Sequence, residues 1–226
     1  MSAQPSRVFV VSAPSGTGKG TLINLAREMY RQKFGKDLVL SVSYTTRPPR
    51  EGEQEGVEYH FVSLEEFKQM EANKEFYETA PFSDRWYGTP KRYVLEAKRL
   101  GLDVLLEIEV KGARKLKLNE EFPEFTSAFI LPPDRSQQIL RLLGRKQNNP
   151  QDLRRRVDEA AEEIRNYRMY DYVIVNEPGR AAEAAAQLFR ILAGVEPRPN
   201  PSTIKRRVAE ILATYNRRKD KNPNHG

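Results

Sequence analysis

A glycine-rich turn between an apolar run and an amphipathic segment restricts the possible folds more than any other feature. Arg7–Ser12 is short, apolar and β-branched, as in a buried strand, and it leads directly into Ala13-Pro-Ser-Gly-Thr-Gly-Lys19. From Thr21 to Lys33, apolar residues repeat at helical spacing. This order suits phosphate binding, because glycines let the backbone wrap a phosphate and the helix N-terminus supplies positive potential. The sequence therefore predicts a phosphate loop.

Lys19 is the side chain that we expect to reach the phosphate oxygens. A glycine-rich turn with a solvated lysine is the plainer alternative, which the flanking strand and helix disfavour. The next position, usually the Mg²⁺-binding Ser or Thr, is Gly20, so the hydroxyl of Thr21 is expected to touch phosphate instead. This Gly-Lys-Gly-Thr form resembles the loop of adenylate kinases and similar nucleoside monophosphate kinases, which implies ATP as the ligand. The residues expected to bind ATP here are Ala13, Pro14, Ser15, Gly16, Thr17, Gly18, Lys19, Gly20 and Thr21.

Apolar runs and helix-periodic segments alternate along most of the chain, which predicts a parallel sheet covered by helices. The exception is 44–90, where short strands and turns suggest an inserted β-rich subdomain. A proline-rich linker at 196–201 precedes an amphipathic helix whose apolar residues run from Ile204 to Tyr215. The expected strands are 7–12, 38–43, 58–62, 103–110, 126–131 and 172–175; helices are expected at 21–33, 90–100 and 180–192, with others starting near 63, 132 and 150. Ser63-Leu-Glu-Glu66 has the spacing of a capping box, and Gly101 is expected to end the helix at 90–100.

Composition excludes several classes of protein. The chain has no cysteine, which rules out disulfides and cysteine nucleophiles, and its two histidines argue against a histidine metal site. Its apolar runs are far shorter than the roughly 18 residues of a membrane span, and no secretory signal begins the sequence, so we expect a cytoplasmic protein. Most of the net charge of +7 lies in 196–226, which holds eight basic and three acidic side chains. Nucleic acid is therefore not an expected partner of the body, although the tail leaves that open.

A second informative segment follows the predicted strand at 38–43. Arg47 and Arg50 stand three residues apart with prolines between them, so both guanidinium groups can address one phosphate. Taken alone, these two arginines would indicate only a charged surface loop. The surrounding sequence resembles the guanylate kinase family, whose pattern is S-x-T-T-R-x-P-R-x-G-E-x-x-G-x-x-Y-x-F, followed by F-x-E and Y-Y-G-[ST]. The matching residues are Ser43, Thr45, Thr46, Arg47, Pro49, Arg50, Gly52, Glu53, Gly56, Tyr59, Phe61, Phe76, Glu78, Tyr87, Gly88 and Thr89.

The resemblance extends from about Arg7 to Leu192, and it implies a GMP site. Glu78 also makes chemical sense there, because guanine offers adjacent N1–H and N2–H donors that one carboxylate can accept together, whereas adenine offers no such pair. An exposed strand glutamate is the alternative. By resemblance, the GMP phosphate is held by Arg47, Arg50, Tyr59 and Tyr87, and guanine is contacted by Ser43, Glu78 and Thr89.

Two glutamates stand where the family usually has Asp-x-Asp, in Glu107-Ile-Glu109-Val-Lys111-Gly112. A carboxylate at the end of a sheet strand can orient water on Mg²⁺, so Glu107 is expected near the Mg²⁺ that accompanies ATP. Glu109, the next one inward, is expected to face the base of GMP. The alternative is that both glutamates lie at the edge of a strand without a functional role, and the free-energy cost of burying carboxylates disfavours it. Lys111 departs from the family's Gln.

A basic region from Arg141 to Arg156 resembles the lid that closes over ATP in this family, although a solvated helix face is the plainer explanation. Asn176, at the end of a predicted strand, would approach adenine by resemblance, or else cap a turn. His60 is expected to be structural. The side chains expected to neutralise charge during the reaction are Lys19, Arg141, Arg145 and Arg156 on the ATP side and Arg47 and Arg50 on the GMP side.

The resemblance implies an α/β fold of the P-loop nucleoside monophosphate kinase type, with a parallel sheet core and helices on both faces. Its expected parts are a domain at 5–194, with a GMP-binding subdomain at about 41–92 and a helical lid at about 143–166, and a linker and basic tail at 195–226. The implied activity is phosphorylation of GMP to GDP by ATP with Mg²⁺, in purine nucleotide metabolism and GMP recycling, by a monomer or homodimer. The tail helix is expected to pack on the body or on a second subunit.

Two alternatives remain open at this stage. A non-catalytic interaction module of the same fold, which binds phosphopeptides, typically lacks the loop lysine and the paired arginines, whereas Lys19, Arg47 and Arg50 are present here. A related kinase for a sugar phosphate would lack Glu78 and the tyrosine-rich acceptor motif. The sequence therefore favours the GMP kinase.

Overall fold

The computed structural model describes residues 6–82, 84–144 and 150–216. The chain divides into two compact units, Met1–Ser12 with Phe34–Ser127 (the first unit) and Ala13–Lys33 with Ala128–Gly226 (the second unit). Each unit is described by itself below. Among the described residues, no helix is long and apolar enough to cross a membrane.

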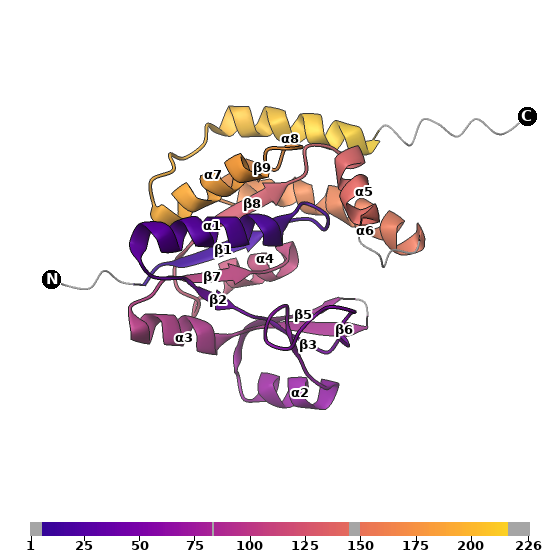
Figure 1. Ribbon diagram of the computed structural model, residues 1–226. Helices are drawn as coiled ribbons and strands as arrows, with labels where there is room; N and C mark the ends of the chain where they lie inside the picture. Colours follow the sequence, from indigo (N-terminus) through magenta and orange to yellow (C-terminus); the bar gives the residue numbers. More distant parts are fainter. Residues whose placement is uncertain (1–5, 83, 145–149, 217–226) are drawn as a thin grey trace, which may run out of the picture. The chain divides into compact units, whose positions relative to one another are not determined.

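The first unit contains a buried set of parallel strands (Figure 1). The central strand pairs on both sides, so that Val104 stands opposite Val8 on one edge and Val39 on the other. Their side chains are almost entirely apolar, as expected for parallel strands that are covered on both faces. The strands, in spatial order, are β2 (Val39–Ser41), β7 (Val104–Glu107) and β1 (Val8–Ser12).

A small mixed sheet occupies 44–90 of the same unit and confirms the predicted β-rich insertion. Its core consists of Tyr44, Phe67 and Phe76, with Trp86 packed against them. The helix beside it starts with the predicted capping box, because Ser63 and Glu66 each accept the other's backbone N–H. The elements are β4 (His60–Phe61), β3 (Tyr44–Thr45), β6 (Arg85–Pro90) and β5 (Phe76–Phe82) in spatial order, and α2 (Leu64–Ala72).

Two further helices of the first unit flank β7 in the chain. Helix α3 (Lys91–Leu100) ends at Gly101, whose φ of 65° closes the helix in the left-handed conformation, as predicted. Helix α4 (Val110–Leu118) corrects the expectation of one strand over 103–110, because β7 stops at Glu107 and a new helix begins at Val110. The buried residues Val110, Ala113 and Leu116 recur every three residues, which is a helical spacing, and it overrides the strand-like run before it.

The second unit contains the glycine loop, a parallel strand pair and most of the helices. The strands β8 and β9 are paired in register from Ala128 opposite Tyr172 to Leu131 opposite Val175. The helix expected near 132 starts at Arg135, because Asp134 caps it by accepting the N–H of Gln137. The elements are α1 (Lys19–Phe34), β8 (Phe125–Leu131), α5 (Arg135–Leu143), α6 (Pro150–Arg165), the 3₁₀ turn η1 (Asn166–Met169), β9 (Tyr172–Val175), α7 (Ala181–Ala193) and α8 (Pro201–Asn216).

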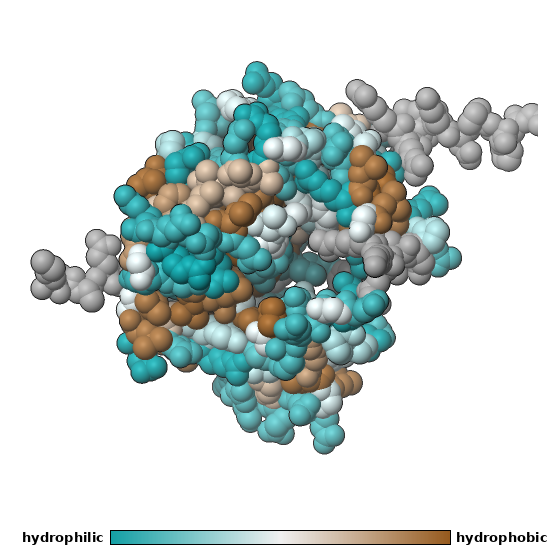
Figure 2. Space-filling model, in the orientation of Figure 1, coloured by the Kyte–Doolittle hydropathy of each residue, from teal (hydrophilic) through white to brown (hydrophobic). Residues whose placement is uncertain are grey.

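Helix α8 packs on α5 and α6 of its own unit (Figure 1). Its Val208 and Ile211 are buried. The tail helix, expected to pack on the body or on a second subunit, therefore contacts helices of its own unit. Figure 2 shows hydrophobic residues in several separate patches on a mainly hydrophilic face. Such scattered exposure is ordinary for a folded domain. Parallel strands with intervening helices confirm the predicted α/β class.

Candidate functional site

The glycine loop joins β1 to α1, and two of its glycines cannot be replaced without strain. Gly16 has φ +82°, and a Cβ there would stand 2.8 Å from Leu142 Cγ. Gly18 has φ +86°, and a Cβ there would stand 2.9 Å from Asn176 Nδ2. Both positions combine a left-handed backbone with close neighbours, which only glycine accommodates. The sequence motif is therefore folded as a tight loop that opens directly into a helix N-terminus, as phosphate binding requires.

Side chains of the second unit hold the carbonyl groups of this loop. Gln138 Nε2 donates to Ser15 O at 2.7 Å, and the carbonyl of Thr17 accepts both Arg141 Nη1 at 3.0 Å and Asn176 Nδ2 at 2.7 Å. Gln138, Thr17 and Asn176 are all buried. Fixed carbonyls define the orientation of the loop's peptide groups, and a phosphate loop works by presenting oriented N–H groups. These contacts therefore prepare the loop before any ligand arrives.

Arg141, expected as a lid arginine, lies on α5 beside the loop. Its other terminal nitrogen, Nη2, donates to Asn176 O at 2.8 Å. Burial lowers the pKa of Arg141, although Asp134 and Glu177 act in the opposite direction. Arg156 lies half-buried on α6. Arg145 lies outside the described residues. The charge-neutralising roles of all three arginines stay predictions.

The remaining ATP-side residues surround the start of α1. Lys19 is the first residue of that helix, and Thr21 is exposed on its first turn. A Cβ at Gly20 would meet nothing within 4 Å, so crowding does not explain why glycine follows the lysine. The side chain of Asn176 is tied to the loop carbonyl, and its Oδ1 is buried without a partner among residues 6–82, 84–144 and 150–216. An approach of Asn176 to adenine stays a prediction.

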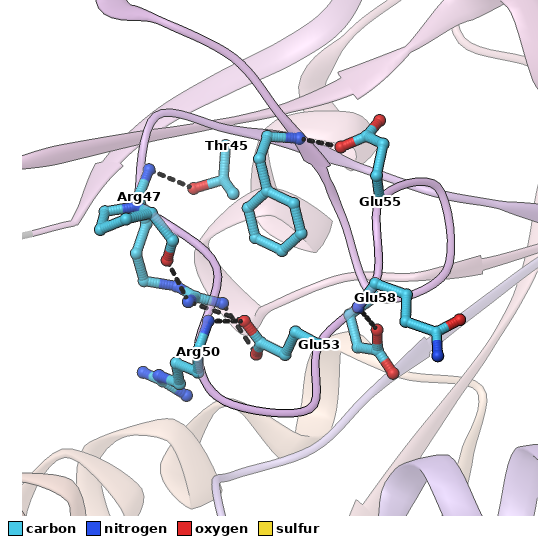
Figure 3. A network of polar contacts seen from close by, with 9 residues as sticks. Thr45, Arg47, Arg50, Glu53, Glu55 and Glu58 are labelled. Carbon is cyan, nitrogen blue, oxygen red and sulfur yellow. Dashed lines mark hydrogen bonds and ion pairs between the residues drawn. The ribbon is translucent and has the colours of Figure 1, made fainter.

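In the first unit, Arg47 is clamped by Glu53 (Figure 3). Nη1 donates to Oε2 at 2.8 Å and Nη2 donates to Oε1 at 3.0 Å, a bidentate pair, while Nη1 also reaches Pro48 O at 2.7 Å. Burial lowers the pKa of Arg47, but the hydrogen bond and charge of Glu53, with a contribution from Tyr87, raise it overall. The guanidinium is therefore fixed in direction and permanently charged.

Two tyrosines expected at the GMP phosphate gather around this arginine. The guanidinium carbon of Arg47 lies 5.4 Å from the ring centre of Tyr59, and the rings of Tyr59 and Tyr87 meet edge to face at 5.7 Å. Burial and the negative charges of Glu109 and Glu107 raise the pKa of Tyr59, so its hydroxyl stays protonated at neutral pH. Arg50 is exposed, and its backbone N–H donates to Glu53 Oε2 at 2.8 Å (Figure 3). The structure thus brings Arg47, Tyr59 and Tyr87 together, and it joins Arg50 to them through the backbone contact with Glu53.

The predicted guanine contacts Glu78 and Thr89 stand opposite each other on β5 and β6. Thr89 Oγ1 donates to Glu78 Oε1 at 2.7 Å, whereas Glu78 Oε2 is buried and has no hydrogen-bond partner in the described part of the chain. Burial raises the pKa of Glu78; Thr89 and Lys115 lower it, and Glu109 raises it further. A Cβ at Gly112 of α4 would stand 3.0 Å from Glu78 Oε1, so glycine makes room for this carboxylate. An oxygen left unsatisfied in this way is suited to accept N–H groups from a ligand.

Ser43, the other predicted guanine contact, and His60 make hydrogen bonds within the small sheet and its surroundings. Ser43 uses its carbonyl to accept His60 N at 2.9 Å, which joins the start of β3 to β4. His60 bonds Glu55 Oε1 at 2.6 Å and Tyr93 Oη at 2.8 Å, and Arg92 Nη2 lies 2.7 Å from its Nε2. Both ring nitrogens are therefore used within the subdomain, which confirms the structural role expected for His60.

Glu107, expected near Mg²⁺, and Glu109, expected to face the base of GMP, differ in their structural settings. Glu107 ends β7 beside Val11, as predicted. Glu109 lies beyond the strand and not further inward on it: it is the N-terminal cap residue of α4, with an exposed side chain that makes no cap hydrogen bond. Among the described residues, no group of three or more acidic or histidine side chains could hold a metal ion unaided. Mg²⁺ is usually bound by one or two carboxylates with substrate phosphates and water, and Glu107 fits the first of these parts.

Three residues of the site have roles that the motifs did not predict. Gln138 supports Ser15, Glu53 directs Arg47, and Gly112 makes room for Glu78. For Gln138 a signal exists, because Gln138 and Leu142 share the buried face of α5 at a spacing of four. A polar residue on such a face needs a buried hydrogen-bond partner. Glu53 lies only six positions from Arg47, inside the matched motif, but the motif does not say which side chain it holds. For Gly112 the partner Glu78 is distant in sequence, and no local pattern names it.

Comparison with known proteins gives a consistent result. The family model described as guanylate kinase matches residues 5–193. A guanylate kinase of Frankia casuarinae is 42% identical over 190 residues, covering 84% of this chain and 98% of that protein. A guanylate kinase of Latilactobacillus sakei is 44% identical over 170 residues, covering 75% of this chain and 81% of that protein. The crystal structure of guanylate kinase from Anaplasma phagocytophilum aligns with a TM-score of 0.63 and 31% identity, over 91% of this chain and 94% of that one.

Proposed function

Since the chain belongs to the guanylate kinase family and is a kinase of the P-loop fold, we propose that it transfers the terminal phosphoryl group of ATP to GMP, giving ADP and GDP. This reaction would return GMP to the purine nucleotide pool. A cytoplasmic location and a monomeric or homodimeric state stay predictions.

The observation that carries the choice of GMP is the half-satisfied carboxylate of Glu78. Thr89 occupies Oε1, and Oε2 is buried without a partner among the described residues. Guanine can supply adjacent N–H donors to such a carboxylate, and adenine cannot. A buried polar group that the wrong ligand leaves unpaired is a strong basis for discrimination.

The phosphate groups of the two nucleotides have separate sets of ligands. On the second unit, the loop that starts at Ala13 and ends in Lys19 is proposed to hold the phosphates of ATP. On the first unit, Arg47 and Arg50 with Tyr59 and Tyr87 are proposed to hold the phosphate of GMP. Phosphoryl transfer depends on positioning and on neutralising the charge of the moving group, and a phosphate acceptor at neutral pH is already ionised. No side-chain base is therefore needed.

Mg²⁺ is proposed to come with ATP. When bound, it would neutralise charge on the phosphate oxygens. Glu107, at the end of β7, would orient its water ligands, and Thr21 would touch phosphate. The donors present fit a metal that is held mainly by nucleotide oxygens.

A coupled assay of ADP release tests this proposal. The chain would be incubated with ATP, Mg²⁺ and one of GMP, AMP, UMP or no acceptor. Turnover should require GMP, and Lys19→Ala should abolish it while the fold is retained in circular dichroism. Absence of turnover above the blank with GMP would reject the kinase and support a non-catalytic interaction module. Turnover with another acceptor would reject GMP as the substrate.

A further inference from the structure

Helix α8 lies beyond the segment that matches the family. The match ends at residue 193, whereas α8 starts at Pro201 and packs on α5 and α6. Structural likeness continues past residue 193, because the Anaplasma structure covers 91% of this chain. Since the family model does not include α8, the role of this helix is inferred from its own contacts.

A hydrogen-bond chain through the buried side chain of Gln138 joins α8 to the phosphate loop. The hydroxyl of Tyr215 donates to Gln138 Oε1 at 2.7 Å, and Gln138 Nε2 donates to Ser15 O at 2.7 Å. The side chain of Gln138 is fully buried, so its amide depends on these partners. Burial raises the pKa of Tyr215, which keeps the hydroxyl protonated and able to donate. The orientation of the amide that supports the loop is thus set from α8.

Two further contacts tie α8 to the same supports. Thr214 Oγ1 accepts the backbone N–H of Arg135 at 3.0 Å, which satisfies a donor in the first turn of α5. Arg207 Nη2 donates to Glu177 at 2.6 Å, directly after Asn176, whose side chain holds Thr17. The two segments that hold the loop carbonyls, α5 and the residues after β9, are therefore both hydrogen-bonded to α8 within the second unit.

We propose that α8 is a brace for the phosphate loop, and that Tyr215 is a positioning residue for ATP binding that acts through Gln138 on Ser15. The proposal rests on the proposed function only in taking the loop to bind the phosphates of ATP. Helix α8 supports the phosphate loop through contacts within the second unit, whereas the residues around Arg47 belong to the first unit. We therefore expect it to affect the binding of ATP and to leave GMP recognition in the first unit unchanged.

The test compares Tyr215→Phe with Tyr172→Phe. Tyr172 is a matched control, because its hydroxyl likewise donates one hydrogen bond within the second unit, but to the backbone carbonyl of Glu196 at 3.0 Å and not to Gln138. The dissociation constant for MgATP without GMP, the KM for GMP and the unfolding temperature are measured for both. For Tyr215→Phe we expect MgATP binding to weaken by roughly three- to tenfold, as loss of one hydrogen bond to a buried group predicts, with the KM for GMP unchanged.

A second variant guards against an effect of stability alone. Thr214→Val removes the acceptor for Arg135 and should weaken MgATP binding in the same direction by about twofold or more. Tyr172→Phe should lower the unfolding temperature without changing MgATP affinity. Wild-type affinity in both Tyr215→Phe and Thr214→Val would overturn the brace while leaving the proposed function intact. A wild-type chain that binds no MgATP would overturn both the brace and the proposed function. If MgATP binding weakens equally in Tyr172→Phe, the effect comes from a general loss of stability, and the brace is rejected.

Discussion

Thr89 and Glu78 share one hydrogen bond of 2.7 Å, and it engages only one oxygen of the carboxylate. The other oxygen, Oε2, is buried and lacks a partner among the described residues. Burying a charged oxygen without a hydrogen bond is costly, and a ligand with N–H donors would remove this cost. This arrangement supports recognition of guanine and leads to the first two predictions.

Glu78→Gln should lower kcat/KM for GMP by about a hundredfold or more, because the amide would place N–H groups against the N–H donors of guanine. The dissociation constant for MgATP should change little, since Glu78 belongs to the first unit and the phosphate loop to the second. Steady-state kinetics with GMP and calorimetry with MgATP measure the two effects. Equal losses for both nucleotides would remove Glu78 from the guanine site.

Thr89→Val should produce a smaller defect of the same kind. The carboxylate keeps its charge but loses the hydroxyl that orients it, so we expect kcat/KM for GMP to fall about five- to twentyfold. Thr79→Val is the matched control, because Thr79 Oγ1, on the neighbouring strand β5, also donates to a glutamate, Glu71 Oε1 of α2, at 2.6 Å. If the control loses as much activity as Thr89→Val, the effect belongs to the sheet and not to the orientation of Glu78.

Stability should depend on pH through Glu78. Burial raises its pKa in the folded state, so the folded protein holds this proton more tightly than the unfolded chain does. The resulting contribution to stability is complete below the unfolded pKa of about 4.3 and is lost as the pH rises through the raised folded value. The unfolding temperature of Glu78→Gln minus that of the wild type should therefore increase from pH 4.5 to pH 7. A constant or shrinking difference would contradict this sign.

Glu53→Gln should weaken GMP binding, because Arg47 would lose the carboxylate that fixes both of its terminal nitrogens. We expect the KM for GMP to rise by about three- to tenfold, the range of one charge-assisted hydrogen bond. Glu58→Gln is the control, because Glu58 lies in the same loop and accepts the backbone N–H of Gln54 at 2.8 Å without touching Arg47 (Figure 3). A KM in Glu53→Gln no higher than that of the control would show that the clamp is dispensable.

The sequence predicts those parts of the fold and site whose determinants are close together in the chain. The loop around Gly16, the capping box at Ser63 and the end of α3 at Gly101 each follow from a few adjacent residues, and the structure confirms all three. The start of α4 was missed, because the apolar residues before Glu109 suit a strand and the helical spacing becomes visible only after Val110. Local patterns suffice where the deciding interaction is itself local.

Several of the unpredicted contacts in the site join residues that are distant in the sequence. Gln138 and Ser15 are 123 positions apart, and Tyr215 and Gln138 are 77 apart. A lone buried glutamine signals that a partner exists, but not which one it is. The motif residues were easier to place, because the family pattern lists them, whereas the groups that orient them are fixed only by the tertiary fold.

Gly112→Ala should separate stability from recognition. Gly112 lies inside α4, where alanine is favoured over glycine by about 0.8–1 kcal/mol, so the helix itself would gain stability. The new Cβ, however, would stand 3.0 Å from Glu78 Oε1 and push the carboxylate away from its place beside Thr89. We expect an unfolding temperature equal to or above that of the wild type, together with a KM for GMP raised about fivefold or more by the misplaced acceptor and an unchanged dissociation constant for MgATP. Thermal unfolding and steady-state kinetics on one preparation decide this. An unchanged KM for GMP would show that the carboxylate has room to move, and that Gly112 does not set its position.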